Sequence, residues 1–256
     1  MDDLNAPRGS QPITRRRIHY FSGFDPRGAA HYHRLCREQA AKPQPHGGVV
    51  NVAAREKLSA HVSRWQVRWR KDAATQDAVD TEHVFMGWDD LVRAHWSQGP
   101  LELAREFVLA YAHMFRHIGA LRVWRMYRPA FNAGMLPFMV LLGPLLIAGL
   151  LAATLGPWGL ALGVAAAAGV WTLATRAGLF WLLRIFSFYR RMGIGPVAGL
   201  DARSREWVEL IVTRQQQDPV DEILLVGHSV GAMVMVAAVD ALLHDERWRL
   251  LQPGWA

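Results

Sequence analysis

A stretch of 43 residues without a charged side chain, Ala133–Thr175, constrains the fold of this chain more than any other feature. As one helix it would be about 65 Å long, whereas one crossing of a bilayer needs about 30 Å. The stretch therefore fits two crossings joined by a turn, which we place at Gly156–Gly159, a Gly-Pro-Trp-Gly sequence. The predicted spans are Gly134–Leu155 and Gly159–Arg176, the second of which could continue to Leu183. A buried hairpin of a soluble core is the alternative, but such helices usually keep a polar stripe, which is missing here.

The charges on either side of this stretch predict its orientation. Arginines flank it at both ends, whereas the turn between the spans has none, and no Asp or Glu occurs between Glu106 and Asp201. The flanking arginines are Arg116, Arg122, Arg125, Arg128, Arg176, Arg184, Arg190 and Arg191. By the positive-inside rule, we expect a multi-pass protein of the inner (cytoplasmic) membrane with both termini in the cytoplasm and bilayer lipid as a partner.

Composition narrows the class of protein. The chain has 256 residues, of which 51% are hydrophobic and 20% charged, and this excludes a disordered or fibrous protein. The single cysteine, Cys36, excludes an intramolecular disulfide and a multi-cysteine zinc site. A net charge of +7 suits nucleic acid, anionic lipid or a membrane-facing surface.

Short apolar strands alternate with helices on both sides of the membrane stretch, which predicts an α/β domain with a parallel sheet. We expect a mobile tail over residues 1–13, the two parts of this domain over 14–131 and 188–256, and the helical hairpin inserted between them over 132–187. The expected strands are Arg17–Ser22, His61–Arg70, Glu82–Met86 and Glu222–Val226, and the expected helices are Ala29–Lys42, Leu91–Trp96, Leu101–Tyr127, Asp201–Gln216 and Val230–His244.

The sequence Gly-His-Ser-Val-Gly at residues 227–231 is the motif most directly linked to chemistry. It follows a buried-type strand and precedes an apolar helix, which is the context that a nucleophile elbow requires. Such a turn would expose the hydroxyl of Ser229 as a nucleophile, and the amide of Val230, at the helix N-terminus, could donate to an oxyanion. A merely structural Gly-Ser turn is the alternative.

With this motif and its flanking strand and helix, the chain resembles the α/β-hydrolase family. The segment Phe21–Phe24 adds to the likeness, because Ser22-Gly23 stands where a His-Gly loop often stands in that family. The resemblance implies that the amide of Phe24 completes the oxyanion hole. Two further segments, residues 22–42 and 87–96, resemble bacterial membrane-associated relatives of this family.

The family order of catalytic residues is Ser, then Asp or Glu, then His, but only 27 residues follow Ser229. Asp240 and His244 lie on the helix that leaves the elbow, and a rise of 1.5 Å per residue puts His244 about 22 Å away. We therefore expect the α/β sheet to be incomplete, the chain to be truncated at its C-terminus, and the catalytic acid and base to lie elsewhere.

The predicted function is a membrane-anchored serine hydrolase that acts on an ester, a thioester or a lipid acyl bond, with Ser229 as nucleophile and no cofactor or metal. The alternative is a non-catalytic, hydrolase-like scaffold or docking protein. A metal pair at His31 and His33 is disfavoured because residues i and i+2 of a helix point apart. Aromatic and basic residues alternate over 65–70, but an amphipathic strand explains them equally well, so nucleic acid is not an expected partner.

Overall fold

The computed structural model describes residues 13–44, 47–70, 79–96, 99–126 and 128–251. Its contacts divide the chain into two compact units, Met1–Ala94 with Ala198–Ala256, and His95–Val197. The first unit is α/β, as predicted, and the second is helical. The second unit contains more residues than the insertion that we expected at 132–187. Residues 95–131 belong to it and not to the unit that contains the sheet.

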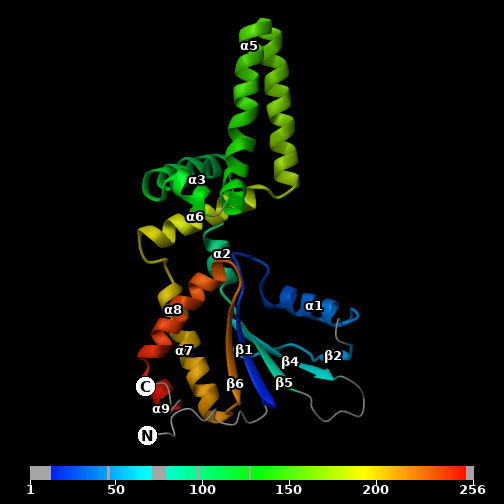
Figure 1. Cartoon of the computed structure of the whole chain (residues 1–256), viewed down its shortest axis with the longest axis vertical. Helices are drawn as coiled ribbons and strands as arrows, with labels where there is room; N and C mark the ends of the chain where they lie inside the picture. The colour runs from blue at the N-terminus through cyan, green and yellow to red at the C-terminus, as the bar shows by residue number, and fades with distance from the viewer. Residues whose placement is uncertain (1–12, 45–46, 71–78, 97–98, 127, 252–256) are drawn as a thin grey trace. The chain divides into compact units, whose positions relative to one another are not determined.

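A sheet of six strands forms the centre of the first unit, in the order β2-β4-β5-β1-β6, with β3 paired to β4 (Figure 1). The strands are β1 (Arg15–Phe21), β2 (Val49–Val52), β3 (Glu56–Lys57), β4 (Val62–Arg70), β5 (Asp80–Met86) and β6 (Glu222–Gly227). The helices of this unit are α1 (Gly28–Ala40), α2 (Asp89–Ala94), α7 (Leu200–Gln217), α8 (Val230–His244) and α9 (Glu246–Leu251).

The sheet is mixed, so the prediction of a parallel sheet is correct only in part. Strand β1 runs parallel to both β5 and β6, whereas β4 is antiparallel to β5, and β2 and β3 are antiparallel to β4. Only nine residues separate Arg70 from Asp80, and a parallel connection needs a crossover of about a dozen or more. Strands β4 and β5 must therefore pair as antiparallel neighbours.

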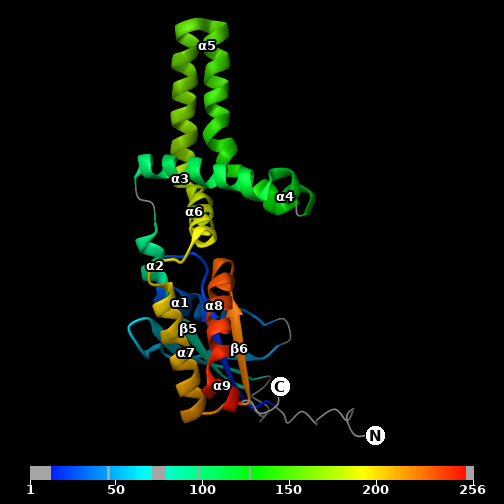
Figure 2. The same ribbon diagram turned by 90° about the vertical axis from the view of Figure 1, so that its left-hand side faces the viewer.

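Helices cover both faces of this sheet. Successive side chains of a strand point to opposite faces. Tyr20 of β1 lies against Tyr32 of α1, with ring centroids 5.6 Å apart, and Phe21 packs edge-on against Trp207 of α7 at 5.1 Å. Helix α1 therefore lies on one face of the sheet, and α7 with α8 on the other (Figure 2).

A buried ion-pair cluster lies at the amino ends of β1 and β5. Arg17 is fully buried and donates to Glu82, which also accepts hydrogen bonds from Arg64 (3.0 Å) and Arg214 (2.7 Å). Burial raises the pKa of Glu82, but its bonds to Arg17 and Arg64 outweigh that effect, so its pKa is lowered. Part of the positive charge of the chain is therefore neutralised by ion pairs within the fold.

The second unit contains α3 (Pro100–His113), a π-helical turn (Met114–Ile118), α4 (Ala120–Met126), α5 (Arg128–Arg176) and α6 (Phe180–Ile194). Residues of α3, α5 and α6 form its core, including Leu103, Tyr111 and Leu183. The Tyr111 hydroxyl donates to the Gly134 carbonyl at 2.5 Å. Buried Glu106 accepts from Arg190 and Arg191, both on α6.

Helix α5 contains the apolar stretch and is the one helix of the described chain that is long and apolar enough to cross a membrane. The most apolar 18-residue window of Phe131–Arg176 has a mean hydropathy of 2.3, and only 6% of that window is buried. The backbone leaves helical geometry at Gly156 (φ 60°, ψ −141°), where two helical segments meet. The segments lie side by side (Figures 1 and 2), and a Cβ atom on Gly163 would be 2.4 Å from the Ala148 Cα.

Two histidines of the sheet, the buried His19 and the half-buried His83, should make the first unit sensitive to acid. Burial and the charge of Arg17 lower the pKa of His19 to about 3, and burial lowers that of His83 to about 4. Below pH 6.5 the unfolded chain therefore binds protons that the folded chain does not, so stability falls as pH falls. Each histidine should contribute a loss of about 1.4 kcal/mol per pH unit.

Thermal unfolding in detergent solution, followed between pH 7 and pH 5, measures this effect. The His19→Leu variant should show a shallower dependence on pH than the wild type. His244→Leu is the comparison variant, because it removes a histidine side chain that is largely exposed in the folded chain. A wild-type midpoint that does not move between these pH values would contradict the prediction.

Candidate active site

The predicted nucleophile lies at a sharp bend between β6 and α8. Strand β6 ends at Gly227 and helix α8 begins at Val230, so that only His228 and Ser229 connect them. Ser229 has φ 54° and ψ −123°, and is the one non-glycine residue of the described chain with positive φ. Such a conformation costs a serine about 1–3 kcal/mol and persists only where the surrounding structure enforces it.

Backbone hydrogen bonds hold this bend against β1. The His228 N–H donates to the Phe21 carbonyl at 3.0 Å, which continues the pairing of β6 with β1. Inside the turn, the Gly231 N–H donates to the His228 carbonyl (2.9 Å) and the Ala232 N–H to the Ser229 carbonyl (3.0 Å). The bend is therefore fixed by main-chain atoms at both of its ends.

The two glycines of the motif allow the close approaches that the bend requires. A Cβ atom on Gly231 would lie 2.2 Å from the Ser22 carbonyl oxygen, and one on Gly227 would lie 2.4 Å from the Ala232 Cα. Neither position can accept a side chain without moving the backbone. Close packing of the backbone therefore explains both glycines of the motif, whether or not the serine is catalytic.

The bend also gives Ser229 access to solvent. His228 and Ser229 are exposed, whereas Val230 is buried. Val230 is the first residue of α8, and the first N–H groups of a helix have no acceptor within it. The partial positive charge of the helix N-terminus therefore lies next to the Ser229 hydroxyl.

The loop after β1 lies beside this bend, as the predicted oxyanion site requires. A Cβ atom on Gly23 would be 3.5 Å from the Ser229 Cβ, so the two loops are in contact. The Trp88 indole donates to the Ser22 carbonyl at 2.9 Å, and the buried ring of Phe24 lies 6.2 Å from that of Trp88. The role of the Phe24 amide stays a prediction.

None of the described residues makes a hydrogen bond to the Ser229 hydroxyl. The described residues therefore place no catalytic base at this serine. His244 and Asp240 lie on α8, where the His244 Nδ1 is 2.7 Å from the Asp240 carbonyl oxygen. Both side chains are largely exposed, at 73% and 76%. They form a local pair near the end of the helix and contact nothing at the elbow.

The acidic residues after β1 and β5 are paired with arginines. Asp25 accepts from Arg27 and from the Tyr32 hydroxyl, and Asp89 accepts from Arg93.

The neighbouring carboxylate, Asp90, accepts two hydrogen bonds from Arg203, which lower its pKa. Arg203 is almost completely buried and also donates to the Gly87 carbonyl at 2.7 Å. The sequence does not predict this partner, because it lies 113 positions from Asp90 and no local pattern links the two residues.

The described residues contain no cluster of three or more His, Cys, Asp or Glu side chains that could hold a metal ion. The Nε2 of His33 lies 2.8 Å from the Ala53 carbonyl oxygen, and the Nδ1 of His31 lies 3.0 Å from the Arg34 guanidinium. The two histidines therefore have different neighbours and do not converge on one site.

Comparisons of the chain with protein-family models, with curated proteins and with solved structures found no match. The candidate site therefore has to be judged by its geometry and its chemistry.

Replacing Ser229 by glycine should stabilise the first unit, because glycine adopts positive φ without the steric cost that serine carries. The Ser229 side chain makes no capping hydrogen bond to α8, so its removal should cost little. We expect Ser229→Gly to be more stable by about 1 kcal/mol, or about 2–4 °C in the unfolding midpoint. Ser229→Ala keeps a Cβ atom and should show no such gain. Equal midpoints for the two variants would contradict the strained geometry.

Proposed function

We propose that the protein is a serine hydrolase that uses Ser229 to cleave an ester, a thioester or a lipid acyl bond. The observation that carries this proposal is the strained, solvent-exposed conformation of Ser229 between β6 and α8. Strain of this kind is unfavourable for folding, and it occurs preferentially at functional sites. The resemblance of the sequence around Ser229 to α/β-hydrolases points to the same chemistry.

In the proposed reaction, the Ser229 oxygen attacks the carbonyl carbon of the substrate, and the carbonyl oxygen becomes an oxyanion. The amides of Val230 and Phe24 would donate to this oxygen. Collapse of the intermediate expels the alcohol or thiol and leaves an acyl group on Ser229, which water then releases as a carboxylic acid. A histidine must accept the serine proton, and it has to come from outside the described residues.

The proposal also places α5 in the cytoplasmic membrane as a two-segment anchor, with Gly156 at its tip and both chain termini in the cytoplasm. The 46-residue stretch Phe131–Arg176 would measure about 69 Å if straight, enough for two crossings of about 30 Å. Their low burial supports contact with lipid, because water would be a poor solvent for such a surface.

A non-catalytic scaffold is the second candidate. It is favoured by the lack of a described histidine at the Ser229 hydroxyl, because a serine without a base is a weak nucleophile. Ser22 also stands where a histidine is common in the family that the chain resembles.

Labelling with a fluorophosphonate probe separates the two candidates. An activated serine forms a covalent phosphonyl adduct, so the full chain in native membranes should be labelled. The Ser229→Ala variant should lose the label, whereas Ser204→Ala, which changes a buried serine of α7, should keep it. A wild-type chain that is not labelled, or a Ser229→Ala variant that still is, would favour the scaffold.

Cysteine accessibility tests the proposed orientation. In a Cys36→Ser background, Trp158→Cys puts a thiol beside Gly156, and Val49→Cys puts one on β2. Trp158 is 81% exposed and Val49 is 71% exposed. In intact cells, a membrane-impermeant maleimide should label only the cysteine at position 158. Labelling at both positions, or at position 49 alone, would contradict the orientation.

A further inference from the structure

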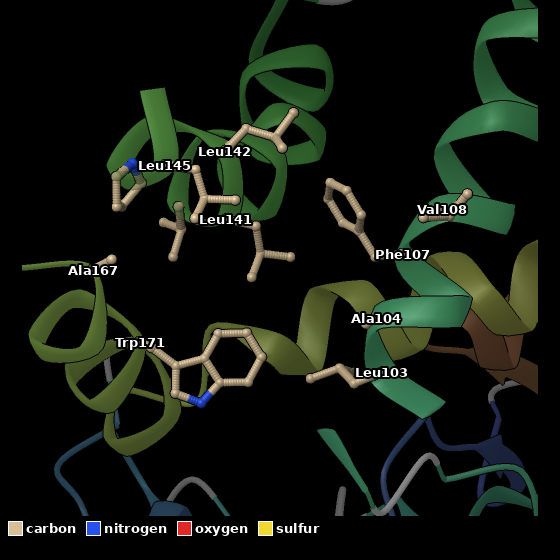
Figure 3. A pocket seen from close by; sticks show the side chains of 11 residues that line it. Leu103, Ala104, Phe107, Val108, Leu141, Leu142, Leu145, Ala167 and Trp171 are labelled. Atoms are coloured by element: carbon tan, nitrogen blue, oxygen red, sulfur yellow. The ribbon is translucent and has the colours of Figure 1, made fainter. Parts of the chain in front are cut away.

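The second unit contains an apolar cavity of about 340 Å³ at the edge of its core (Figure 3). Leu103 and Phe107 line it from α3, Val140 and Leu141 from the first segment of α5, and Ala167 and Trp171 from the second. The rings of Phe107 and Trp171 point into the space between these walls (Figure 3). Every lining residue has a hydrocarbon or aromatic side chain, and the indole N–H of Trp171 is the single polar side-chain group among them. A buried water needs two to four polar partners, so these side chains favour an apolar occupant.

The size of the cavity suits a hydrocarbon chain better than a protein helix. An apolar cavity of about 150 Å³ accommodates one benzene molecule, so this cavity has room for a segment on the order of a dozen carbon atoms. A helix about 10 Å wide occupies about 420 Å³ per turn. The cavity is therefore too small to hold even one turn of α5 from a second copy of the chain.

The exposed apolar surface and the charge of the second unit indicate what kind of lipid would bind. Two of the three cavity walls belong to α5, whose apolar surface is largely exposed. The 94 residues between Glu106 and Asp201 contain eight arginines and no acidic residue. Several of these arginines are exposed: Arg116, Arg122, Arg125, Arg128 and Arg176. A phospholipid with an anionic head group complements this charge.

We propose that the cavity between α3 and the two segments of α5 binds one acyl chain of an anionic phospholipid from the surrounding bilayer. The inference rests on the proposed insertion of α5 in a membrane, but it is independent of any chemistry at Ser229. Bound lipid would fill a gap that the side chains leave open and so fix α3 against α5.

Native mass spectrometry of the full chain tests this proposal. The chain would be reconstituted in nanodiscs of phosphatidylglycerol or of phosphatidylcholine and then released into mild detergent. The wild type should retain one phospholipid, and the retained fraction should be at least threefold higher from phosphatidylglycerol. Equal retention from the two lipids would overturn the preference for an anionic head group.

Filling the cavity should abolish this retention. Ala167→Trp places an indole in the space from α5, and we expect at least a fivefold loss of bound lipid. Ala165→Trp is the matched control, because position 165 lies about 200° away around the same helix and does not line the cavity. Ala104→Trp fills the cavity from α3 and should repeat the loss if Ala167→Trp fails to fold.

Three results would overturn the proposal: no lipid on the wild type, the same lipid occupancy in the cavity variants as in Ala165→Trp, or a lipid-free dimer that the cavity variants dissociate. The last result would mean that a second copy covers this face. Membrane fractionation of the cells that express the same variants separates this failure from that of the proposed function. A chain that remains in membranes without a retained lipid contradicts only the cavity proposal, whereas a chain that leaves them contradicts the anchor.

Discussion

The parallel pairing of β1 with β6 is the interaction on which the rest of the first unit depends. It joins residues about 206 positions apart, from Arg16 opposite Glu222 to Phe21 opposite Gly227. At the amino end, the Asp221 carboxylate accepts the Thr14 and Arg15 N–H groups and so fixes the register. At the carboxyl end, the same register places the loop after β1 beside the bend that carries Ser229. A shift by one residue would turn every β6 side chain to the other face and remove this contact.

This pairing also explains how a helical unit of about a hundred residues can be inserted into the α/β unit. The chain leaves the first unit after α2 and returns at Ala198. A Cβ atom on Gly199 would lie 3.0 Å from the Leu91 Cδ2 of α2, so the points of departure and return are neighbours. Because the insertion starts and ends at almost the same place, β1 and β6 can pair whatever the structure of the inserted residues. The proposed anchor and the candidate catalytic site can therefore occupy one chain without sharing a core.

The sequence predicts the elements of the first unit that have a strong local pattern. Helix α8 has the expected bounds, and β6, β4 and α7 each differ from their expected ranges by one residue at one or both ends. The short strands β2 and β3 were missed, because four and two residues are too few to show a periodic pattern. The direction of β4 was also missed, although the short connection to β5 could have revealed it.

The second unit was harder to predict, because its boundaries depend on packing between distant segments. A single helix was expected over Leu101–Tyr127, but the described chain has a π-helical turn there, followed by Gly119 with φ 78°. Nothing in the local hydrophobicity marks that break.

Within the candidate site, the motif predicts the bend at Ser229. The resemblance also implied that the loop after β1 approaches Ser229, as the contact of Gly23 with Ser229 requires. The Asp90–Arg203 pair, in contrast, arises only from the tertiary fold.

The proposed chemistry depends on the backbone of Ser229, which is held at positive φ at the junction of a strand and a helix. An experimental structure of the full chain in a lipid environment, at a resolution that defines main-chain carbonyls, measures this angle directly. We expect φ close to +54° at Ser229, with its hydroxyl open to solvent. A negative φ, with Ser229 inside a continuous helix or sealed within the core, would contradict it.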